Sequence, residues 1–235
     1  MKHSKLRFRW TVAVGTILLL GFSMRSISAA QEATSKTEEI EWTWEVRPAR
    51  ADAKLPNVLL LGDSITRAYF PEVQRQLDGV ANVYLMASST SVGDPRLARQ
   101  IEEFSSAEGM KFSVVHFNNG MHGWAYSEKE YRDAFPAFVS EIRALAPKAA
   151  LIWATTTPVK KETEPGPTNA RVDARNTIAE SLVKPAGIAI DDQHGMMTKH
   201  ADLYQDSVHF NDQGAVLQGK QAAELIRQLL SHSQQ

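Results

Sequence analysis

Short apolar runs alternate with amphipathic stretches from residue 57 onward, which is typical of βα units around a parallel sheet. The runs are brief and rich in Val, Ile and Leu, as expected for strands covered on both faces. They predict five strands, at residues 57–62, 82–86, 112–118, 150–155 and 187–192. The amphipathic stretches predict helices at residues 71–78, 95–107, 128–145, 170–183 and 212–230.

These elements predict an α/β fold, a three-layer α/β/α sandwich with a five-stranded parallel, flavodoxin-like sheet. The domain is expected to span residues 55–235, a length that allows one sizeable core. Ligands of such folds bind beyond the carboxyl ends of the strands, near the switch in strand order. Residues that act on a substrate should therefore follow strands directly.

The first 30 residues differ from the rest of the chain. Basic residues precede the apolar run TVAVGTILLLGF, which is followed by the small residues Ser28, Ala29 and Ala30. This order predicts a signal peptide at residues 1–30, cleaved after Ala30, and a periplasmic or secreted protein without stable membrane insertion. An uncleaved anchor is the alternative, although the run is shorter than the roughly 20 residues of a spanning helix.

Residues 31–54 are polar and charged apart from Trp42, Trp44 and Val46, and we expect a tail or strap that leads into the domain. We call this segment the strap. Its tryptophans are expected to pack on the domain surface, with sugar stacking as the alternative. The chain has no cysteine, which excludes disulfides and thiolate metal sites. Its net charge of -1 gives no support to a nucleic-acid partner.

Gly62-Asp63-Ser64 ends the first predicted strand. A nucleophilic serine needs an exposed hydroxyl and nearby backbone N–H groups, and a strand-to-helix turn supplies both. The alternative is that Asp63 or Ser64 only caps the next helix.

Asp206 and His209 lie between the fifth predicted strand and the last helix. At a spacing of three residues they can point the same way, so Asp206 can favour the His209 tautomer that accepts a proton from serine. Taken alone, they can equally be a surface pair, or His209 a cap. Their combination with Ser64 at the other end of the domain favours catalysis.

GDSIT at 62–66 resembles the first block of the SGNH (GDSL-like) hydrolases, in which the serine is the nucleophile, and DSVHF at 206–210 resembles their last block, an Asp-x-x-His pair. The resemblance covers about residues 57–230. It implies a serine esterase without a cofactor, whose catalytic triad is Ser64, Asp206 and His209. The G-x-S-x-G elbow of α/β-hydrolases is absent around Ser64.

The resemblance also implies an oxyanion hole formed by backbone N–H groups of Ser64 and of Ser91 or Gly93, where members of the family carry a glycine after the second strand. Their third block, commonly Gly-x-Asn-Asp, is here Gly120-Met121-His122-Gly123. His122 therefore occupies the asparagine position, and a neutral imidazole can donate one N–H there.

The sequence allows two alternatives to His122. Asn118 or Asn119 can swing in as the oxyanion donor, or the cluster can be purely structural. For substrate binding, the candidates are Asp63, Trp124 and Tyr126, with core packing as the alternative for the two aromatic residues.

The expected substrate is a small-molecule or carbohydrate ester with a small acyl group, such as O-acetyl on an extracellular carbohydrate. A lipase would show a longer apolar patch near the site. The histidines lack zinc-site spacings, so no metal is expected. Charges in the polar segment 154–171 are expected to be solvated, with Lys160, Lys161 and Arg171 as alternative substrate contacts.

Two other classes of protein fit parts of the sequence. One is a catalytically silent carbohydrate-binding protein of the same fold, which the altered third block allows. The other is an unrelated flavodoxin-like module, which predicts that Ser64 lies far from His209.

Overall fold

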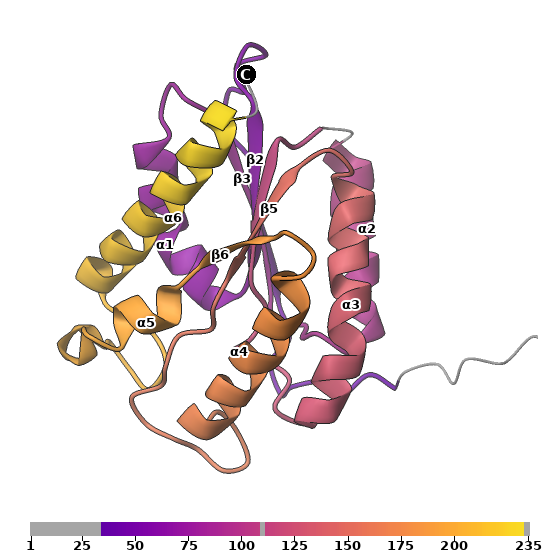
Figure 1. Ribbon diagram of the computed structural model, residues 1–235, viewed down its shortest axis with the longest axis vertical. Helices are drawn as coiled ribbons and strands as arrows, with labels where there is room; N and C mark the ends of the chain where they lie inside the picture. The colour runs from indigo at the N-terminus through magenta and orange to yellow at the C-terminus, as the bar shows by residue number, and fades with distance from the viewer. Residues whose placement is uncertain (1–33, 109–110, 233–235) are drawn as a thin grey trace, which may run out of the picture. The chain divides into compact units, whose positions relative to one another are not determined.

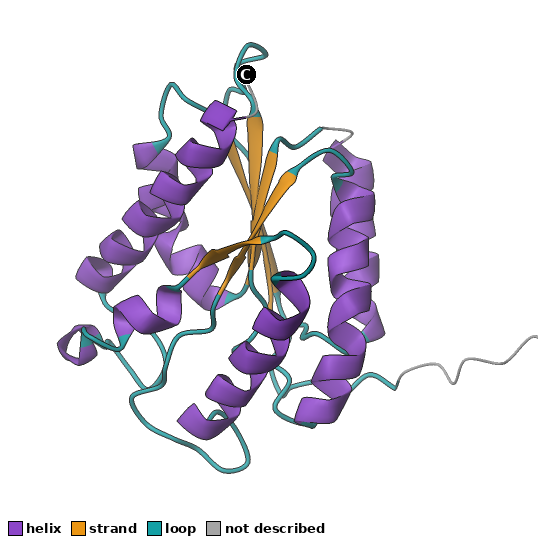
Figure 2. Cartoon of the chain, in the orientation of Figure 1, coloured by secondary structure: helices purple, strands orange, loops and turns teal. Residues whose placement is uncertain are grey.

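The computed structural model describes residues 34–108 and 111–232, so the predicted signal peptide lies outside the described residues. A six-stranded sheet forms the centre, in the order β1-β3-β2-β4-β5-β6 (Figures 1 and 2). Its strands are β1 (Thr43–Val46), β2 (Asn57–Gly62), β3 (Asn82–Ser88), β4 (Val114–Phe117), β5 (Ala150–Ala154) and β6 (Ala189–Asp191). Strands β2 to β6 are parallel and follow the flavodoxin-like order, which confirms the predicted fold class.

The sixth strand, β1, belongs to the strap and corrects the prediction of five strands. It pairs antiparallel with β3, with Trp44 opposite Ala87. Its side chains are mostly exposed, so it lacks the apolar run that marks a strand covered on both faces. Strand β1 is therefore an edge of the sheet, and the backbone hydrogen bonds that hold it cannot be predicted from a hydrophobic pattern.

The helices are α1 (Ser64–Gln76), α2 (Pro95–Glu108), α3 (Glu128–Leu145), α4 (Asn169–Val183), the short α5 (Gln193–Met197) and α6 (Asp212–His232). The predicted start at residue 71 is wrong, because α1 begins at Ser64 and contains Pro71 in its interior. Asp63 caps it through the N–H of Ile65, and burial of its apolar face keeps the helix continuous despite the missing proline N–H.

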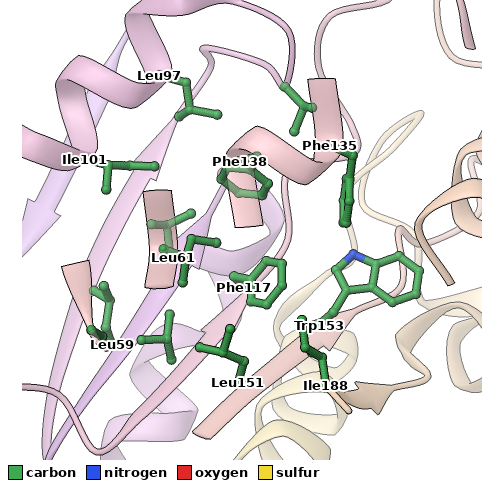
Figure 3. Close-up of a cluster of buried hydrophobic side chains, with 14 of the residues drawn as sticks. Leu59, Leu61, Leu97, Ile101, Phe117, Phe135, Phe138, Leu151, Trp153 and Ile188 are labelled. Carbon is green, nitrogen blue, oxygen red and sulfur yellow. The ribbon is translucent and has the colours of Figure 1, made fainter. Parts of the chain in front are cut away.

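Alternate residues of each strand serve the two faces of the sheet. Val58 and Leu60 face α1 and α6, whereas Leu59 and Leu61 face α2, α3 and α4. Figure 1 shows α1 and α6 on one side and α2 and α3 on the other, and Figure 3 shows the core beneath the latter, where Trp153 meets Phe135. This arrangement is the predicted three-layer sandwich.

The switch in strand order lies at β2, which has β3 on one side and β4 on the other. The segments after β2, β3 and β4 therefore meet at one edge of the sheet, where a ligand is expected. No helix in the described part of the chain is both long and apolar enough to cross a membrane.

Candidate active site

Ser64, His209 and Asp206 form a hydrogen-bonded chain at this edge. Ser64, the first residue of α1, has its Oγ 2.7 Å from Nε2 of His209. On the other side of the imidazole, Nδ1 lies 2.8 Å from Oδ2 of Asp206. The structure thus brings together residues that are 145 positions apart, which contradicts the distant placement expected for an unrelated module. Their catalytic role stays a prediction.

A closed turn before α6 holds Asp206 against His209. Oδ1 of Asp206 accepts the backbone N–H groups of Val208 and His209, each at 2.8 Å. Burial raises the pKa of Asp206, but these N–H groups and the His209 ring outweigh burial and lower the pKa overall. The ionised carboxylate accepts Nδ1–H of His209, which leaves the Nε2 lone pair facing the Ser64 hydroxyl.

The turn before Ser64 is built from Gly62 and Asp63. A Cβ on Gly62 would lie 2.1 Å from Oγ1 of Thr66, so only glycine fits. The buried Asp63 carboxylate accepts the N–H groups of Ile65, at 2.9 Å, and Met121, at 3.4 Å. Asp63 is therefore a helix cap and a tie to the turn after β4, which corrects its assignment to substrate binding. The Ser64 N–H belongs to the first turn of α1, where no intrahelical acceptor exists.

His122 lies in the turn after β4 and is paired with the strap. Its Nδ1 is 2.9 Å from Oε2 of Glu38, and the other carboxylate oxygen accepts the N–H of Gly123 at 3.0 Å. Its Nε2 is buried and has no partner among the described residues. Sequence reasoning missed Glu38, for which the only signal was the acidic run Thr37-Glu38-Glu39-Ile40-Glu41 in a segment predicted to be a tail.

The side chains of Asn118 and Asn119 hold loops rather than face a ligand. Nδ2 of Asn118 donates to the carbonyl of Ala154 and to Thr156, while its Oδ1 accepts the N–H of Gly120. Asn119 likewise bonds the backbone of the loop after β3. Because both N–H groups of Asn118 have acceptors, its assignment to the oxyanion hole is wrong for this arrangement.

Ser91 and Gly93, in the loop after β3, differ in their surroundings. The Ser91 side chain packs on Gly123, where an added Cβ would lie 2.2 Å from Oγ of Ser91. Gly93, with a φ of 99°, faces the ring of Tyr126. Ser91 therefore adjoins the turn of His122, whereas Gly93 faces Tyr126.

Tyr126 fastens the strap, a role different from the substrate contact predicted for it. It is buried, and its hydroxyl accepts the N–H of Lys36 at 2.9 Å and donates to the Thr34 carbonyl at 3.3 Å. Trp124 is half-buried, and its Nε1–H donates to the Met121 carbonyl at 2.8 Å. No contact in the described structure tests its predicted role with substrate.

Two arginines of α4 support the turn after β4. Arg175 is buried and donates to the carbonyls of His122, Gly123 and Tyr126, each at 2.9 Å, with its guanidinium 4.2 Å from the centre of the Trp124 ring. Burial lowers the pKa of Arg175 to about 10. Arg171 bonds Glu128 at 2.6 Å, so its charge is paired with a carboxylate. Sequence reasoning missed Arg175.

Trp42, Trp44 and Arg67 pack together in a cluster that we call the aromatic platform. The Arg67 guanidinium lies 5.2 Å from the Trp42 ring centre and 5.1 Å from that of Trp44. Arg67 is one helical turn after Ser64, and side chains on helices lean toward the N-terminus, which brings it beside the serine. Trp42 also contacts the His122 ring edge to face, with ring centres 6.0 Å apart.

No group of three or more His, Cys, Asp or Glu side chains in residues 34–108 and 111–232 is arranged to hold a metal ion.

A sequence profile of the GDSL-like lipase/acylhydrolase family matches residues 60–217. Solved structures of similar fold include an acetyl xylan esterase (15% identity, TM-score 0.58, covering 72% of this chain and 99% of that one). A mutant acetyl esterase with an acetate ion is 18% identical, with a TM-score of 0.61, covering 76% of this chain and 100% of that one. The lipase/acylhydrolase from Enterococcus faecalis is 18% identical, with a TM-score of 0.60, covering 74% of this chain and 96% of that one. At these identities the likeness shows the fold alone. No curated protein sequence matches the chain.

Proposed function

The chain belongs to the GDSL-like lipase/acylhydrolase family, and we propose that it is a serine esterase that removes small acyl groups, foremost O-acetyl groups on carbohydrate. The observation that carries the proposal is the chain of hydrogen bonds from Asp206 through His209 to Ser64, at 2.8 and 2.7 Å. It supplies a hydroxyl, a base with the right tautomer and an ionised orienter, as nucleophilic catalysis requires.

In the proposed reaction, His209 Nε2 takes the Ser64 proton as Oγ attacks the ester carbonyl. The carbonyl oxygen becomes an oxyanion that accepts N–H groups of Ser64, Ser91 and His122. His209 then returns the proton to the leaving alcohol oxygen, which breaks the C–O bond and leaves an acyl-serine. Water, deprotonated by His209, hydrolyses the acyl-serine and restores the enzyme.

The proposal of a small acyl group and a carbohydrate alcohol is based on the side chains at the surface of the domain. Among the described residues, Ile40 and Trp44 are the large hydrophobic side chains that are exposed, which is little apolar surface for a lipase. Trp44 is 51% exposed within the aromatic platform and offers apolar area to the C–H face of a sugar. Two proteins of similar fold are an acetyl xylan esterase and an acetyl esterase.

The experiment compares the purified protein with Ser64→Ala on nitrophenyl acetate, butyrate and octanoate. We expect activity that is highest on acetate and falls by at least about 10³-fold in the variant, because the acyl-enzyme cannot form. A serine-directed phosphonate should label Ser64, as seen by peptide mass spectrometry. Equal rates for the two proteins, without labelling, would refute the esterase and favour a silent carbohydrate-binding protein.

Trp44→Ala tests the proposed binding of a carbohydrate substrate separately. Ile40→Ala is the matched control, because Ile40 is also an exposed residue of the strap. We expect Trp44→Ala to raise KM for acetylated xylo-oligosaccharides several-fold while leaving nitrophenyl acetate hydrolysis unchanged. Ile40→Ala should alter neither. An unchanged KM in Trp44→Ala would reject the platform as a sugar site.

We further propose export, on the basic, apolar and small-residue order of residues 1–30. N-terminal sequencing of protein recovered from the periplasm or medium should begin at Gln31. Full-length protein retained in the cytoplasm would reject the signal peptide.

A further inference from the structure

The contact between Glu38 and His122 determines which protons the imidazole carries. Glu38 places one oxygen 2.9 Å from Nδ1 of His122 and the other 3.0 Å from the N–H of Gly123. The strap thus grips two successive residues of the turn after β4 with a single carboxylate. Because an ionised carboxylate only accepts hydrogen bonds, Nδ1 of His122 must carry a proton.

The other nitrogen, Nε2, then has two possible states. In a neutral imidazole it is a bare acceptor, because the single proton resides on Nδ1. Such a ring has no N–H for an oxyanion, contrary to the neutral donor expected from the sequence. In an imidazolium, Nε2–H is a donor, and this atom is buried without a partner among the described residues. A donor role for His122 therefore requires the charged ring.

The charges around His122 favour that state. The strap contributes Glu38 and Glu41, and the N-terminus of α1 contributes Asp63. Trp42 presents its ring to the imidazole, and Arg175 of α4 binds the backbone carbonyl of His122. Arg175 thus faces the peptide oxygen of His122, and a second cation, Arg96, pairs with Glu41 at 2.9 Å. Glu38 and Asp63 act on the ring, and Glu41 acts on it from its pair with Arg96.

The pKa values move in the corresponding directions. Burial lowers the pKa of His122, but the hydrogen bond to Glu38 and the charges of Asp63, Glu38 and Glu41 outweigh burial and raise it above 6.5. Burial raises the pKa of Glu38, but the bonds to His122 and Gly123 outweigh burial and lower it below 4.5. Both directions follow from an ionised Glu38 and a protonated His122 that stabilise each other.

We infer that Glu38 and His122 form a standing ion pair in which the imidazolium donates Nε2–H to the reaction oxyanion, so that the N-terminal strap completes the active site. The inference rests on the proposed esterase function for the oxyanion. His122 keeps both protons throughout the reaction and contributes charge, whereas His209 alone transfers protons. His122 is thus a catalytic residue, and Glu38 is a positioning residue that holds its proton and its orientation. A donor that carries charge makes a stronger hydrogen bond than a neutral amide.

Kinetic pH profiles test the inference on nitrophenyl acetate, with Glu39→Gln as the control, because Glu39 is an exposed carboxylate next to Glu38 in the same strap. The wild-type kcat/KM should fall at alkaline pH, as His122 loses its Nε2 proton. Glu38→Gln should lower kcat about 10- to 100-fold and move the alkaline fall to lower pH, because the counter-ion is lost. Glu39→Gln should do neither.

His122→Asn separates charge from hydrogen bonding. An amide N–H does not titrate between pH 6 and 10, so this variant should lose the alkaline fall while keeping part of the activity. His122→Ala, which has no donor, should lose about 10²- to 10³-fold in kcat. An alkaline fall that is the same in His122→Asn as in the wild type would overturn the inference.

Nitrogen-15 NMR of the imidazole groups gives a readout that needs no turnover. In Ser64→Ala protein, the His122 ring should carry protons on both nitrogens at pH 7 and should titrate at lower pH in the Glu38→Gln background. A ring protonated only at Nδ1 at pH 7 would overturn the inference even if the esterase activity is real. Conversely, a charged ring in an inactive protein would reject the esterase and leave the ion pair standing. If Glu38→Gln fails to fold, the state of the His122 ring in Ser64→Ala protein decides alone.

Discussion

Substituting Gly123 by alanine should destabilise the turn after β4 and displace the groups of the active site that this turn holds. Gly123 has a φ of 73°, in the left-handed region that disfavours residues with a Cβ. Its N–H donates to Glu38, and its carbonyl accepts from Arg175. An added Cβ would lie 2.2 Å from Oγ and 2.3 Å from Cβ of Ser91. The substitution therefore introduces backbone strain and a steric overlap at once.

Gly187 provides a control that carries the strain alone. Its φ is 67°, and an added Cβ would meet no atom within 4 Å. Left-handed backbone costs a residue with a Cβ about 1–2 kcal/mol, so Gly187→Ala should lower the free energy of unfolding by about that amount. Overpacking a well-filled site costs a further 1–3 kcal/mol or so, which predicts a loss of about 2–5 kcal/mol for Gly123→Ala.

The overlap can be relieved by removing its partner. In Gly123→Ala with Ser91→Gly, the nearest remaining atom is Cδ2 of Tyr126 at 3.3 Å, so the steric part of the loss should be recovered and the strain should remain. The single Ser91→Gly variant completes a double-mutant cycle, whose coupling energy isolates the overlap.

Urea unfolding followed by tryptophan fluorescence measures the free energies, and ester hydrolysis measures the site. Because a displacement of about 1 Å at a catalytic group can cost about 10²-fold, Gly123→Ala should lose activity while folded, whereas Gly187→Ala should retain it. Equal destabilisation of the two alanine variants, or additive effects of Gly123→Ala and Ser91→Gly, would refute the reasoning.

Four further outcomes can be checked. Asp206→Asn should lower kcat by about 10⁴-fold without changing the free energy of unfolding, because an amide does not fix the His209 tautomer that accepts the Ser64 proton. A loss of kcat below tenfold in steady-state kinetics would contradict the role of Asp206 in orienting His209. Arg175→Met removes the arginine donor of the His122 and Gly123 carbonyls, while the Tyr126 carbonyl keeps Arg171, and urea unfolding should report a loss of about 3–5 kcal/mol. Trp153→Ala, in a side chain 1% exposed, should cost about 3–5 kcal/mol in the same assay, and kcat should be unaltered in the protein that stays folded. The lowered pKa of Glu38 gives the fold a stability that is present above pH 4.5 and is lost as the pH falls through the lowered pKa, whereas the raised pKa of His122 gives a stability that is present below pH 6.5 and is lost as the pH rises through the raised pKa. The difference in unfolding free energy between wild type and Glu38→Gln should therefore be largest between those two pKa values and smaller on either side. Urea unfolding at a series of pH values measures this difference, and a constant difference would contradict the prediction.

Local pattern was enough for most of the fold. Runs such as Asn57–Gly62 are apolar because both faces of their strand are covered, and helix α3 was predicted at its observed bounds, 128–145, since its apolar face repeats with the helical period. Pattern failed where tertiary contacts compensate a local penalty. Helix α1 continues through Pro71 because its buried face packs on the sheet. The stabilisation from this packing cannot be read from the residues around Pro71.

The amino-acid pattern predicted the five parallel strands, the sandwich and the two segments that carry the candidate triad, because each depends on residues close in the chain: a strand, the turn that holds Ser64, or the Asp206 carboxylate three residues from the His209 imidazole. The partners of polar groups, in contrast, depended on how the folded chain brings distant segments together. The tertiary structure added β1 to the sheet, tied up the amide of Asn118, and brought Glu38 across 84 residues to Nδ1 of His122. Hydrogen bonds between distant polar groups leave no period in the sequence, and the protonation of an imidazole depends on which group accepts its proton.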